Sequence, residues 1–529
     1  MTFLLLIKYG FSKYFCIILK LFNFIFPFEK PNVVIIVSDD LGWGDVSYHE
    51  SIIPTPNIDR FVSEGLELNR FYSNPICSPT RASLMTGLEA YSVGILRPIS
   101  NPSTNPTGLP LEYKILPEYF KEAGYQTALV GKWHLGMNSK EYLPGQRGFD
   151  TTYGFMNGGI DYFNHTMSGR LDWHKNGVPL REEGYSTDLI ANEAIKVIQN
   201  KQNNKPLLLY VAFNAPHTPI QAPYENIENF GYIDDPKERI YAANISILDK
   251  QIGRIIDSIK DEKLSSNTLI LFFSDNGPVF DIDPIGAVVV PELLNAKGSS
   301  GGLKGSKGSA YEGGIRVPAF MMWEGKFKSE SSNQFFFIQD VLPTLLSAAE
   351  IDYENSFFEG TSRWDSLLKR TVDKPQNSVL AASVAFEEIA LFNEDWKLYF
   401  KKGPAGSNSV NYYELFNIIE DPLEEHDLSK DYPDIFDLMK ETLNKIPKRN
   451  LQGYPDASYL YLHGDRMLSE ESGTPWLNYD FKLLEKPSPI IGTLIFIWIL
   501  LLANKTYAIL FILLAILLIY SIRKKIKRG

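Results

Sequence analysis

From residue 32 onward, short apolar runs rich in β-branched residues alternate with segments of helical periodicity. Four of these runs are continuously apolar, which predicts strands buried on both faces, at residues 32–37, 127–130, 207–213 and 268–273. The clearest helix is predicted at residues 240–259, where apolar side chains recur every three or four positions. This alternation is typical of an α/β fold in which a large, mixed but mostly parallel sheet is flanked by helices.

The pattern changes near residue 380. Short strand-like pieces at residues 396–400 and 412–416 are followed by an acidic stretch with helical character. We therefore predict a large α/β domain at residues 30–380 and a smaller α+β domain at residues 381–485. The length of 529 residues agrees with more than one globular unit.

Both ends of the chain are apolar. Residues 1–29 contain three lysines in an otherwise apolar stretch without a polar face, which predicts a signal peptide or an uncleaved anchor rather than a core helix. Residues 489–522 form two apolar runs with a three-residue break, so we predict a transmembrane region there. If the body is lumenal or extracellular, the basic tail at 523–529 favours a cytoplasmic C-terminus, and hence one span over a hairpin.

The body between these ends is acidic. The chain holds 52 Lys and Arg against 63 Asp and Glu, and the two ends carry bases with almost no acids, so the body is more negative than the net charge of −11 suggests. This charge excludes general nucleic-acid binding. An anionic substrate would need a local cluster of cations.

Only two cysteines occur, Cys16 in the leader and Cys77 in the body. A lone cysteine is by default a small buried hydrophobe. In a chain that passes through an oxidising compartment, however, a body with one cysteine and no internal disulfide is unusual. Cys77 is therefore a candidate functional residue.

Polar side chains follow the predicted strands. Asp39 and Asp40 come after the first strand, and Asp275 and Asn276 come after the strand at residues 268–273. Each of them alone would be read as a turn or cap residue. In parallel sheets, however, ligands bind outside the carboxyl ends of the strands, where these oxygens would meet. An oxygen-only set suits Ca²⁺ or Mg²⁺.

Two other predicted strands end in basic residues. Lys132 and His134 follow the strand at 127–130, and His217 follows the strand at 207–213, in a chain with only seven histidines. Lys307 lies in a Gly/Ser/Lys loop at residues 298–308, where small residues permit close approach of the backbone to a ligand. Together these strand ends predict one site.

The segment around Cys77 predicts the start of a helix. Ser78 is a good N-cap and Pro79 a good first helical residue, which places Cys77 at a helix N-terminus with Arg81 one turn along. Backbone N–H groups there favour negative charge and would lower a thiol pKa. A thiol protease, however, has no need of three acidic metal ligands.

The motif CSPTR at residues 77–81, followed by ASLMTG at 82–87, resembles the signature of the sulfatase family. The resemblance extends over residues 31–430, with DD at 39–40, GKWHLG at 131–136, HTP at 217–219, DNG at 275–277 and KGSAYEGG at 307–314. The segments LPGQRGFD at 143–150 and GYSTD at 184–188 look most like the animal arylsulfatase B group. Unlike that group, this body lacks disulfide cysteines, and it carries a membrane-like tail.

The resemblance implies an alkaline phosphatase-like fold and a sulfuric ester hydrolase. It further implies that a formylglycine-generating enzyme oxidises Cys77 to an aldehyde (3-oxoalanine), whose hydrate binds a divalent cation, Ca²⁺ in preference to Mg²⁺. The metal ligands would be the converted Cys77 and the four strand-end oxygen residues, Asp39, Asp40, Asp275 and Asn276. The catalytic residues would be Cys77, with Arg81, Lys132 and Lys307 as fixed positive charge, His134 as base, and His217 or Lys307 at the leaving group.

The implied substrate is an aryl sulfate or a sulfated carbohydrate, with N-acetylgalactosamine 4-sulfate in glycosaminoglycans as the first candidate. Two alternatives stay open. One is a phosphodiesterase or phosphonate hydrolase on the same scaffold, and the other is a catalytically silent, membrane-tethered glycan-binding protein.

Asn164 is the predicted glycosylation site, whereas the sequon at Asn244 falls on a packed helix. The compartment, whether ER/Golgi, cell surface or lysosome, is left open.

Overall fold

The computed structural model describes residues 30–446 except 100–107, 138, 168–169, 281–297, 384–386 and 404–409. The predicted leader at 1–29, the membrane region at 489–522 and the basic tail at 523–529 lie outside the described residues, as does part of the predicted smaller domain. Within the described ranges, none of the helices combines the length and the apolar character that a membrane crossing requires.

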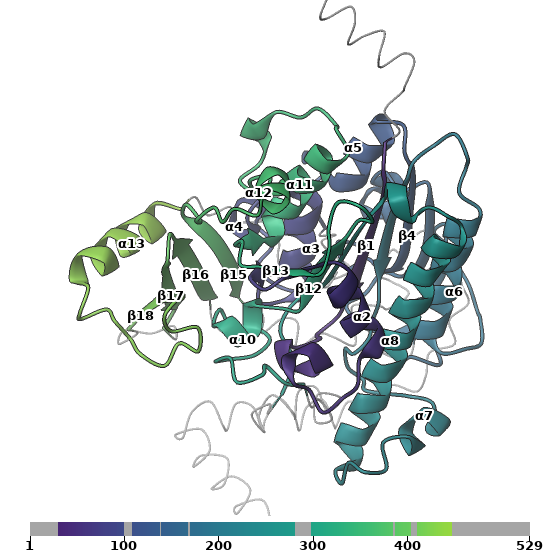
Figure 1. The fold of residues 1–529 in the computed structure, drawn as a ribbon, viewed down its shortest axis with the longest axis horizontal. Helices are drawn as coiled ribbons and strands as arrows, with labels where there is room; N and C mark the ends of the chain where they lie inside the picture. Colours follow the sequence, from purple (N-terminus) through teal and green to yellow (C-terminus); the bar gives the residue numbers. More distant parts are fainter. Residues whose placement is uncertain are drawn as a thin grey trace, which may run out of the picture.

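A ten-stranded mixed sheet forms the centre of the molecule (Figure 1). Its strand order is β13-β2-β12-β11-β1-β10-β4-β5-β8-β9, and the block from β11 to β5 is parallel throughout. The strands are β1 (Asn32–Ser38), β2 (Leu66–Leu68), β4 (Gln126–Lys132), β5 (Thr151–Phe155), β8 (His174–Lys175), β9 (Val178–Pro179), β10 (Leu207–Ala212), β11 (Thr268–Ser274), β12 (Ala319–Met322) and β13 (Glu330–Ser332). The four buried strands and the mostly parallel sheet predicted from the sequence are confirmed.

Side chains of β1 alternate between two apolar cores, one on each face of the sheet, as a buried strand requires. Val34 and Ile36 face one core, which is covered by α2 (Pro56–Glu64), α6 (Ser186–Gln199) and α8 (Pro236–Asp261). Val33 and Ile35 face the other core, which is covered by α3 (Cys77–Thr86), α4 (Ala90–Val93), α5 (Leu116–Glu122), α11 (Val341–Ala348) and α12 (Trp364–Lys369). The helix predicted at residues 240–259 lies within α8.

The remaining elements are short. They are the strands β3 (Phe71–Tyr72), β6 (Thr166–Met167), β7 (Arg170–Leu171) and β14 (Phe336–Phe337), and the helices α7 (Tyr224–Glu228) and α10 (Glu312–Ile315). Single turns of 3₁₀ helix occur at Trp43–Asp45, Ser47–His49, Lys140–Tyr142, Pro144–Gln146, Ser265–Asn267, Ile338–Asp340 and Asn355–Phe357.

A second, four-stranded antiparallel sheet lies beside the large body (Figure 1). It consists of β15 (Ser378–Ser383), β16 (Glu387–Asn393), β17 (Trp396–Lys401) and β18 (Tyr412–Asn417), and α13 (Pro433–Lys445) packs on one face. The opposite face inserts Phe392, Tyr399 and Phe416 into the core of the body. This C-terminal sheet is therefore fixed to the body by shared apolar packing; the domain boundary near residue 380 stays a prediction.

Helix α3 begins two residues earlier than predicted. The helix starts at Cys77, and its N-cap residue is Ile76. Ser78 is not the cap, because its hydroxyl donates to the carbonyl oxygen of His134 at 3.0 Å and accepts from the backbone of Ile99 at 2.9 Å. The prediction for Ser78 was wrong because this tertiary contact takes its side chain, but Cys77 does lie at the helix N-terminus.

The two predicted sequons have different surroundings. Asn164 is exposed, in a turn in which its backbone N–H donates to Asp161 at 2.7 Å. Asn244 is fully buried on α8 and donates to the carbonyl oxygen of Gln221 at 2.9 Å. Glycosylation of Asn164 stays a prediction, and the packed position of Asn244 agrees with its expected lack of use.

Candidate active site

The predicted site residues meet at the carboxyl ends of the parallel strands. Strands β1 and β11 pair with Ser38 opposite Ser274, so the residues that follow them leave the sheet at the same level. The backbone N–H of Asp39 donates to Ala215 and that of Asp275 to Ser38, both at 3.0 Å. The bond from Asp275 holds the two acidic segments side by side, and the bond from Asp39 joins the first of them to the segment after β10. Strand β1 begins at the opposite side of the sheet, where the parallel strands have their amino ends, next to Lys30.

The predicted ligand residues Asp39, Asp40, Asp275 and Asn276 form one buried group. The amide nitrogen of Asn276 donates to Asp40 Oδ1 at 2.7 Å, and the backbone N–H of Asp40 donates to Asp275 Oδ1 at 3.3 Å. Asp40 has a φ of +69°, a left-handed conformation that Asp tolerates better than most residues. The strand ends therefore bring together every oxygen residue that the sequence predicted.

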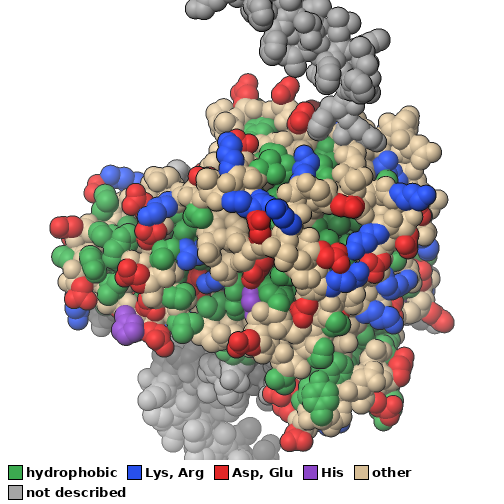
Figure 2. Space-filling view, viewed as in Figure 1, with side chains coloured by type: hydrophobic (Ala, Val, Ile, Leu, Met, Phe, Trp, Pro, Cys, Tyr) green, Lys and Arg blue, Asp and Glu red, His purple; other side chains and the backbone are tan. Residues whose placement is uncertain are grey.

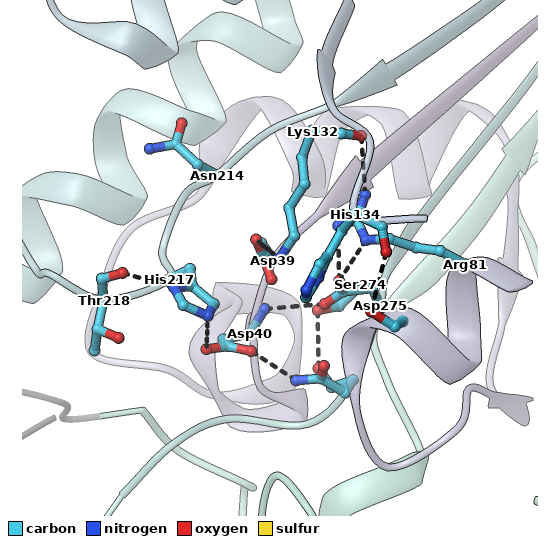
Figure 3. Close-up of polar contacts among 12 residues, drawn as sticks. Asp39, Asp40, Arg81, Lys132, His134, Asn214, His217, Thr218, Ser274 and Asp275 are labelled. Atoms are coloured by element: carbon cyan, nitrogen blue, oxygen red, sulfur yellow. Dashed lines mark hydrogen bonds and ion pairs between the residues drawn. The ribbon is translucent and has the colours of Figure 1, made fainter. Parts of the chain in front are cut away.

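Each of the three carboxylates has a basic partner. Figure 3 shows two of these pairs, Lys132 with Asp39 and Arg81 with Asp275. Lys132 Nζ lies 2.6 Å from Asp39 Oδ2, and both side chains are fully buried. Lys307 Nζ lies 2.6 Å from Asp40 Oδ1 and 2.8 Å from Oδ2. Burial alone would raise the pKa of both acids. For Asp40 the charge of Lys307, the nearby His217 and the hydrogen bonds that it accepts together outweigh burial and lower the pKa, whereas burial raises the pKa of Asp39.

Arg81 is fixed in orientation by three groups. Its Nε and Nη2 donate to Asp275 Oδ2 at 3.1 and 2.7 Å, and its Nη1 donates to the carbonyl oxygen of Lys132 and to the hydroxyl of Tyr210. Arg81 is one helical turn from Cys77 and almost fully buried. A guanidinium held in this way is a fixed positive charge beside Cys77.

Two oxygens of the acidic group have no donor. Asp39 Oδ1 and Asn276 Oδ1 are buried, and neither accepts a hydrogen bond from the described residues. Buried acceptors without a partner are costly, so such oxygens are usually satisfied by a bound group. Ligand atoms of Asp39, Asp40 and His217 lie within 4.8 Å of one another. This donor set fits a hard divalent cation.

The two predicted histidines lie on either side of this group (Figure 3). His134 packs its ring against Gly158, where a Cβ would come within 2.7 Å of the imidazole carbon. The Nδ1 of His217 is 2.6 Å from the carbonyl oxygen of Thr218, which leaves Nε2 facing Asp40 Oδ2 at 3.8 Å. Burial lowers the pKa of His134, and burial together with Lys307 lowers the pKa of His217 to about 3. Both rings are therefore neutral bases at neutral pH.

Cys77 itself is buried, with 2% of its side chain exposed. Burial raises the pKa of the thiol, although Lys132 and Lys307 oppose that effect. The expectation that the helix N-terminus would lower the thiol pKa is therefore wrong, because loss of water around the sulfur outweighs the nearby positive charge. Burial therefore disfavours the thiolate form of Cys77, on which a thiol-based mechanism would depend.

Comparison with known proteins identifies the family. A family model described as sulfatase matches residues 31–351, which is more than half of the chain. The chain belongs to the sulfatase family. The predicted membership is thus confirmed, and with it the prediction that the protein is an enzyme that hydrolyses sulfate esters.

Individual sulfatases agree with this assignment. Mouse arylsulfatase J is 32% identical over 485 residues, covering 81% of this chain and 77% of that protein. Dog N-acetylgalactosamine-6-sulfatase is 32% identical over 343 residues, covering 61% of this chain and 62% of its own length. The solved structure of Ps i-CgsB in complex with k-i-k-neocarrahexaose superposes with a TM-score of 0.72 at 28% identity, covering 84% of this chain and all of that one.

The structure of this sulfatase also places residues that the sequence analysis did not select. Tyr210 lies within the apolar strand β10 and accepts a hydrogen bond from Arg81 at 3.2 Å. Asn214, directly after β10, accepts from Ser186 and has a buried amide nitrogen without a partner among the described residues. A tyrosine inside a fully buried strand was the available signal, since its hydroxyl needs a partner there.

Proposed function

We propose that this sulfatase removes sulfate from a sulfated carbohydrate by means of a formylglycine made from Cys77 and a divalent cation held by the strand-end oxygens. The observation that carries the proposal is the buried acidic group beside Cys77, in which Asp39 Oδ1 and Asn276 Oδ1 accept no hydrogen bond from the part of the chain that the structure describes. Two of the similar sulfatases support a carbohydrate substrate, because one is named for N-acetylgalactosamine 6-sulfate and one was solved with neocarrahexaose. N-Acetylgalactosamine 4-sulfate in glycosaminoglycans is our first candidate.

A sulfate group would be bound by the cluster of cations at the site. On the face shown in Figure 2, Lys and Arg side chains lie among Asp and Glu, so this face is not uniformly basic. Arg81, Lys132 and Lys307, by contrast, converge at the strand ends. Fixed positive charge there stabilises the negative charge that builds up on a transferring sulfuryl group.

The cation would be held by Asp39, Asp40, Asp275 and Asn276 together with the converted Cys77. When bound, such a cation polarises sulfate oxygens and lowers the pKa of a nearby hydroxyl, and Ca²⁺ is our preferred ion. The hydrated aldehyde made from Cys77 would supply one hydroxyl as nucleophile and a second through which sulfate is released.

The other side chains have roles that their positions support. Arg81, one turn from Cys77 and fixed by Asp275, would hold the converted side chain. His134 is neutral and has a buried, unpartnered Nδ1, so it suits a base that takes the proton from the second hydroxyl. Lys307 or His217 would stabilise or protonate the leaving alcohol.

Conversion of Cys77 requires a formylglycine-generating enzyme as a partner during biosynthesis, and hence passage through the secretory pathway. We propose a membrane-anchored protein whose catalytic body is lumenal or extracellular. Support for this placement comes from the apolar leader and tail of the sequence, which lie outside the described residues.

Sulfate release is the direct test of the function. Protein from a secretory-competent eukaryotic cell is offered a sulfate ester and a phosphate ester of the same chromogenic alcohol, and then chondroitin oligosaccharides sulfated at position 4 or 6. We expect sulfate release with little phosphate release. Faster phosphate release would favour the phosphodiesterase alternative, and glycan binding without any release would favour the silent binder.

The leaving-group role can be assigned between the two candidates by a series of aryl sulfates whose phenols differ in pKa. One of the two variants, Lys307→Met or His217→Gln, lacks the residue that protonates the leaving group. That variant should lose roughly 10²-fold or more in kcat/KM on the ester of the least acidic phenol and far less on that of the most acidic one. We expect this steep dependence for Lys307, which is charged, and not for His217, whose pKa is lowered to about 3. A steep dependence for His217→Gln alone would reverse the assignment.

A further inference from the structure

Lys307 lies on a loop outside the regular elements. The loop, residues 303–311 (the Lys307 loop), leads into α10. Its backbone is hydrogen-bonded to two segments that flank the site. The N–H of Lys307 donates to the carbonyl oxygen of Pro278 at 2.8 Å, and the N–H of Gly308 donates to that of Pro75 at 2.7 Å. The side chain of Lys307 reaches Asp40 from this loop.

The loop has little conformational preference of its own. Gly305 and Gly308, on either side of Lys307, have φ values of +83° and +87°, in the region that glycine adopts freely. A segment built in this way loses much conformational entropy when it is fixed. Contacts from outside the loop must therefore define where Lys307 lies.

Glu388, on β16 of the C-terminal sheet, supplies such contacts two and three residues after Lys307. Its Oε2 accepts hydrogen bonds from the hydroxyl of Ser309 at 3.0 Å and from the backbone N–H of Ala310 at 3.1 Å. The same oxygen accepts from the hydroxyl of Tyr399 at 2.9 Å, which holds the carboxylate in place. Glu388 is 7% exposed, so water competes weakly for these bonds.

The end of the loop is fixed by the same sheet. The ring of Tyr311 stacks on that of Tyr399 with centroids 3.8 Å apart. One residue on, the backbone N–H of Glu312 donates to Glu424 at 2.7 Å, and Lys397 pairs with both acids in a fully buried cluster. The contacts of Glu312 with Glu424 and Lys397 do not involve Glu388, so loss of Glu388 should loosen the segment around Lys307 without releasing α10.

We propose that Glu388 is a positioning residue for Lys307, because its hydrogen bonds to Ser309 and Ala310 fix the loop that holds the lysine ammonium on Asp40. The effect on turnover rests on the proposed function, in which Lys307 acts on the sulfate ester. Among the described residues, the side-chain bonds of Glu388 go to Ser309, Ala310, Tyr399 and Lys401 and not to Asp40 or Cys77, so it acts through the loop. Displacement of a catalytic group by about 1 Å can cost roughly 10²-fold in rate.

Three variants test this role. Glu388→Ala removes the acceptor, and we expect kcat to fall about 10- to 100-fold with KM changed less than about threefold. Glu388→Gln keeps one oxygen that can accept from Ser309 and Ala310, so its kcat should stay within about threefold of wild type. Lys401→Gln is the matched control, because Lys401 pairs with Oε1 of Glu388 at 2.9 Å, whereas Ser309 and Ala310 donate to Oε2; its kcat should be unchanged.

Hydrogen exchange gives a readout that does not depend on activity. In Glu388→Ala the amides of the Lys307 loop should exchange about tenfold faster or more, while the amides of α8 keep their protection. If Glu388→Ala does not fold, Ser309→Ala replaces it, with an expected fall in kcat of about threefold to tenfold and faster exchange at Ala310.

The proposal fails if Glu388→Ala loses no more kcat than Lys401→Gln, or if Glu388→Gln is impaired as strongly as Glu388→Ala. Absence of sulfate release by the wild-type protein would instead refute the proposed function. In that case the exchange rates of the loop in Glu388→Ala still decide whether Glu388 positions it.

Discussion

Replacing Cys77 by serine is expected to stop catalysis after a single sulfuryl transfer. Serine offers one hydroxyl in the position beside Arg81 and Lys132, and that hydroxyl can attack sulfur once. The resulting sulfate ester has no second hydroxyl on the same carbon through which sulfate could be expelled. Steady-state kcat should therefore fall by roughly 10⁴-fold or more, as it does when the nucleophile of other hydrolases is removed.

Mass spectrometry of the tryptic peptide that spans residue 77 measures this outcome. After incubation with substrate, the Cys77→Ser peptide should gain the mass of one sulfuryl group. Cys77→Ala is the control, because it can neither accept nor release the group. Continued turnover by the serine variant would show that release does not need a second hydroxyl, and would remove the reason for a formylglycine at this position.

Removal of divalent cations is expected to have a similarly large effect. Three carboxylates converge at the strand ends, and two oxygens of this group accept no hydrogen bond from the described residues. When Lys132 and Lys307 contact the substrate in place of Asp39 and Asp40, a site without a cation keeps negative charge that is not neutralised. Chelation should lower kcat at least about 100-fold, and Ca²⁺ added at about 100 times its Kd should stabilise the fold by about 2.7 kcal/mol. Added Mg²⁺ should restore less.

Thermal unfolding with and without Ca²⁺ separates binding from catalysis. Asn276→Ala removes one unpartnered oxygen and should reduce the shift in Tm that Ca²⁺ produces. Asn32→Ala is the matched control, since Asn32 is also a buried asparagine but lies at the opposite end of β1. That variant should lose stability and keep the full Ca²⁺-dependent shift. Equal shifts in both variants would exclude Asn276 from the cation site.

Much of the central sheet could be predicted from the sequence, because strands buried on both faces are continuously apolar. Strands β1, β4, β10 and β11 were all found in this way, and the residues that follow them predicted the site. Short strands such as β2 and the edge strand β13 carry no comparable signal, since they are three residues long and partly polar. Their pairing depends on tertiary contacts.

The sequence predicted which residues form the site, but not which of them pair with one another. The sequence indicated that Asp39, Asp40 and Lys132 share an edge of the sheet, but only the structure pairs Lys132 with Asp39 and Lys307 with Asp40. Long-range partners such as Glu388, 81 residues beyond Lys307, leave no local pattern. The pKa of Cys77 was misjudged for the same reason, because burial depends on packing that a motif does not reveal.

The direction of β1 has a practical consequence. The strand begins beside Lys30, and Asp39 follows its last residue. The seven residues of the strand span a distance on the order of 20 Å. A support or affinity resin joined ahead of residue 30 therefore attaches at the edge of the sheet opposite the reactive groups. An enzyme immobilised in this orientation keeps the carboxyl ends of its parallel strands away from the support, which suits long, dissolved polysaccharide chains as test substrates.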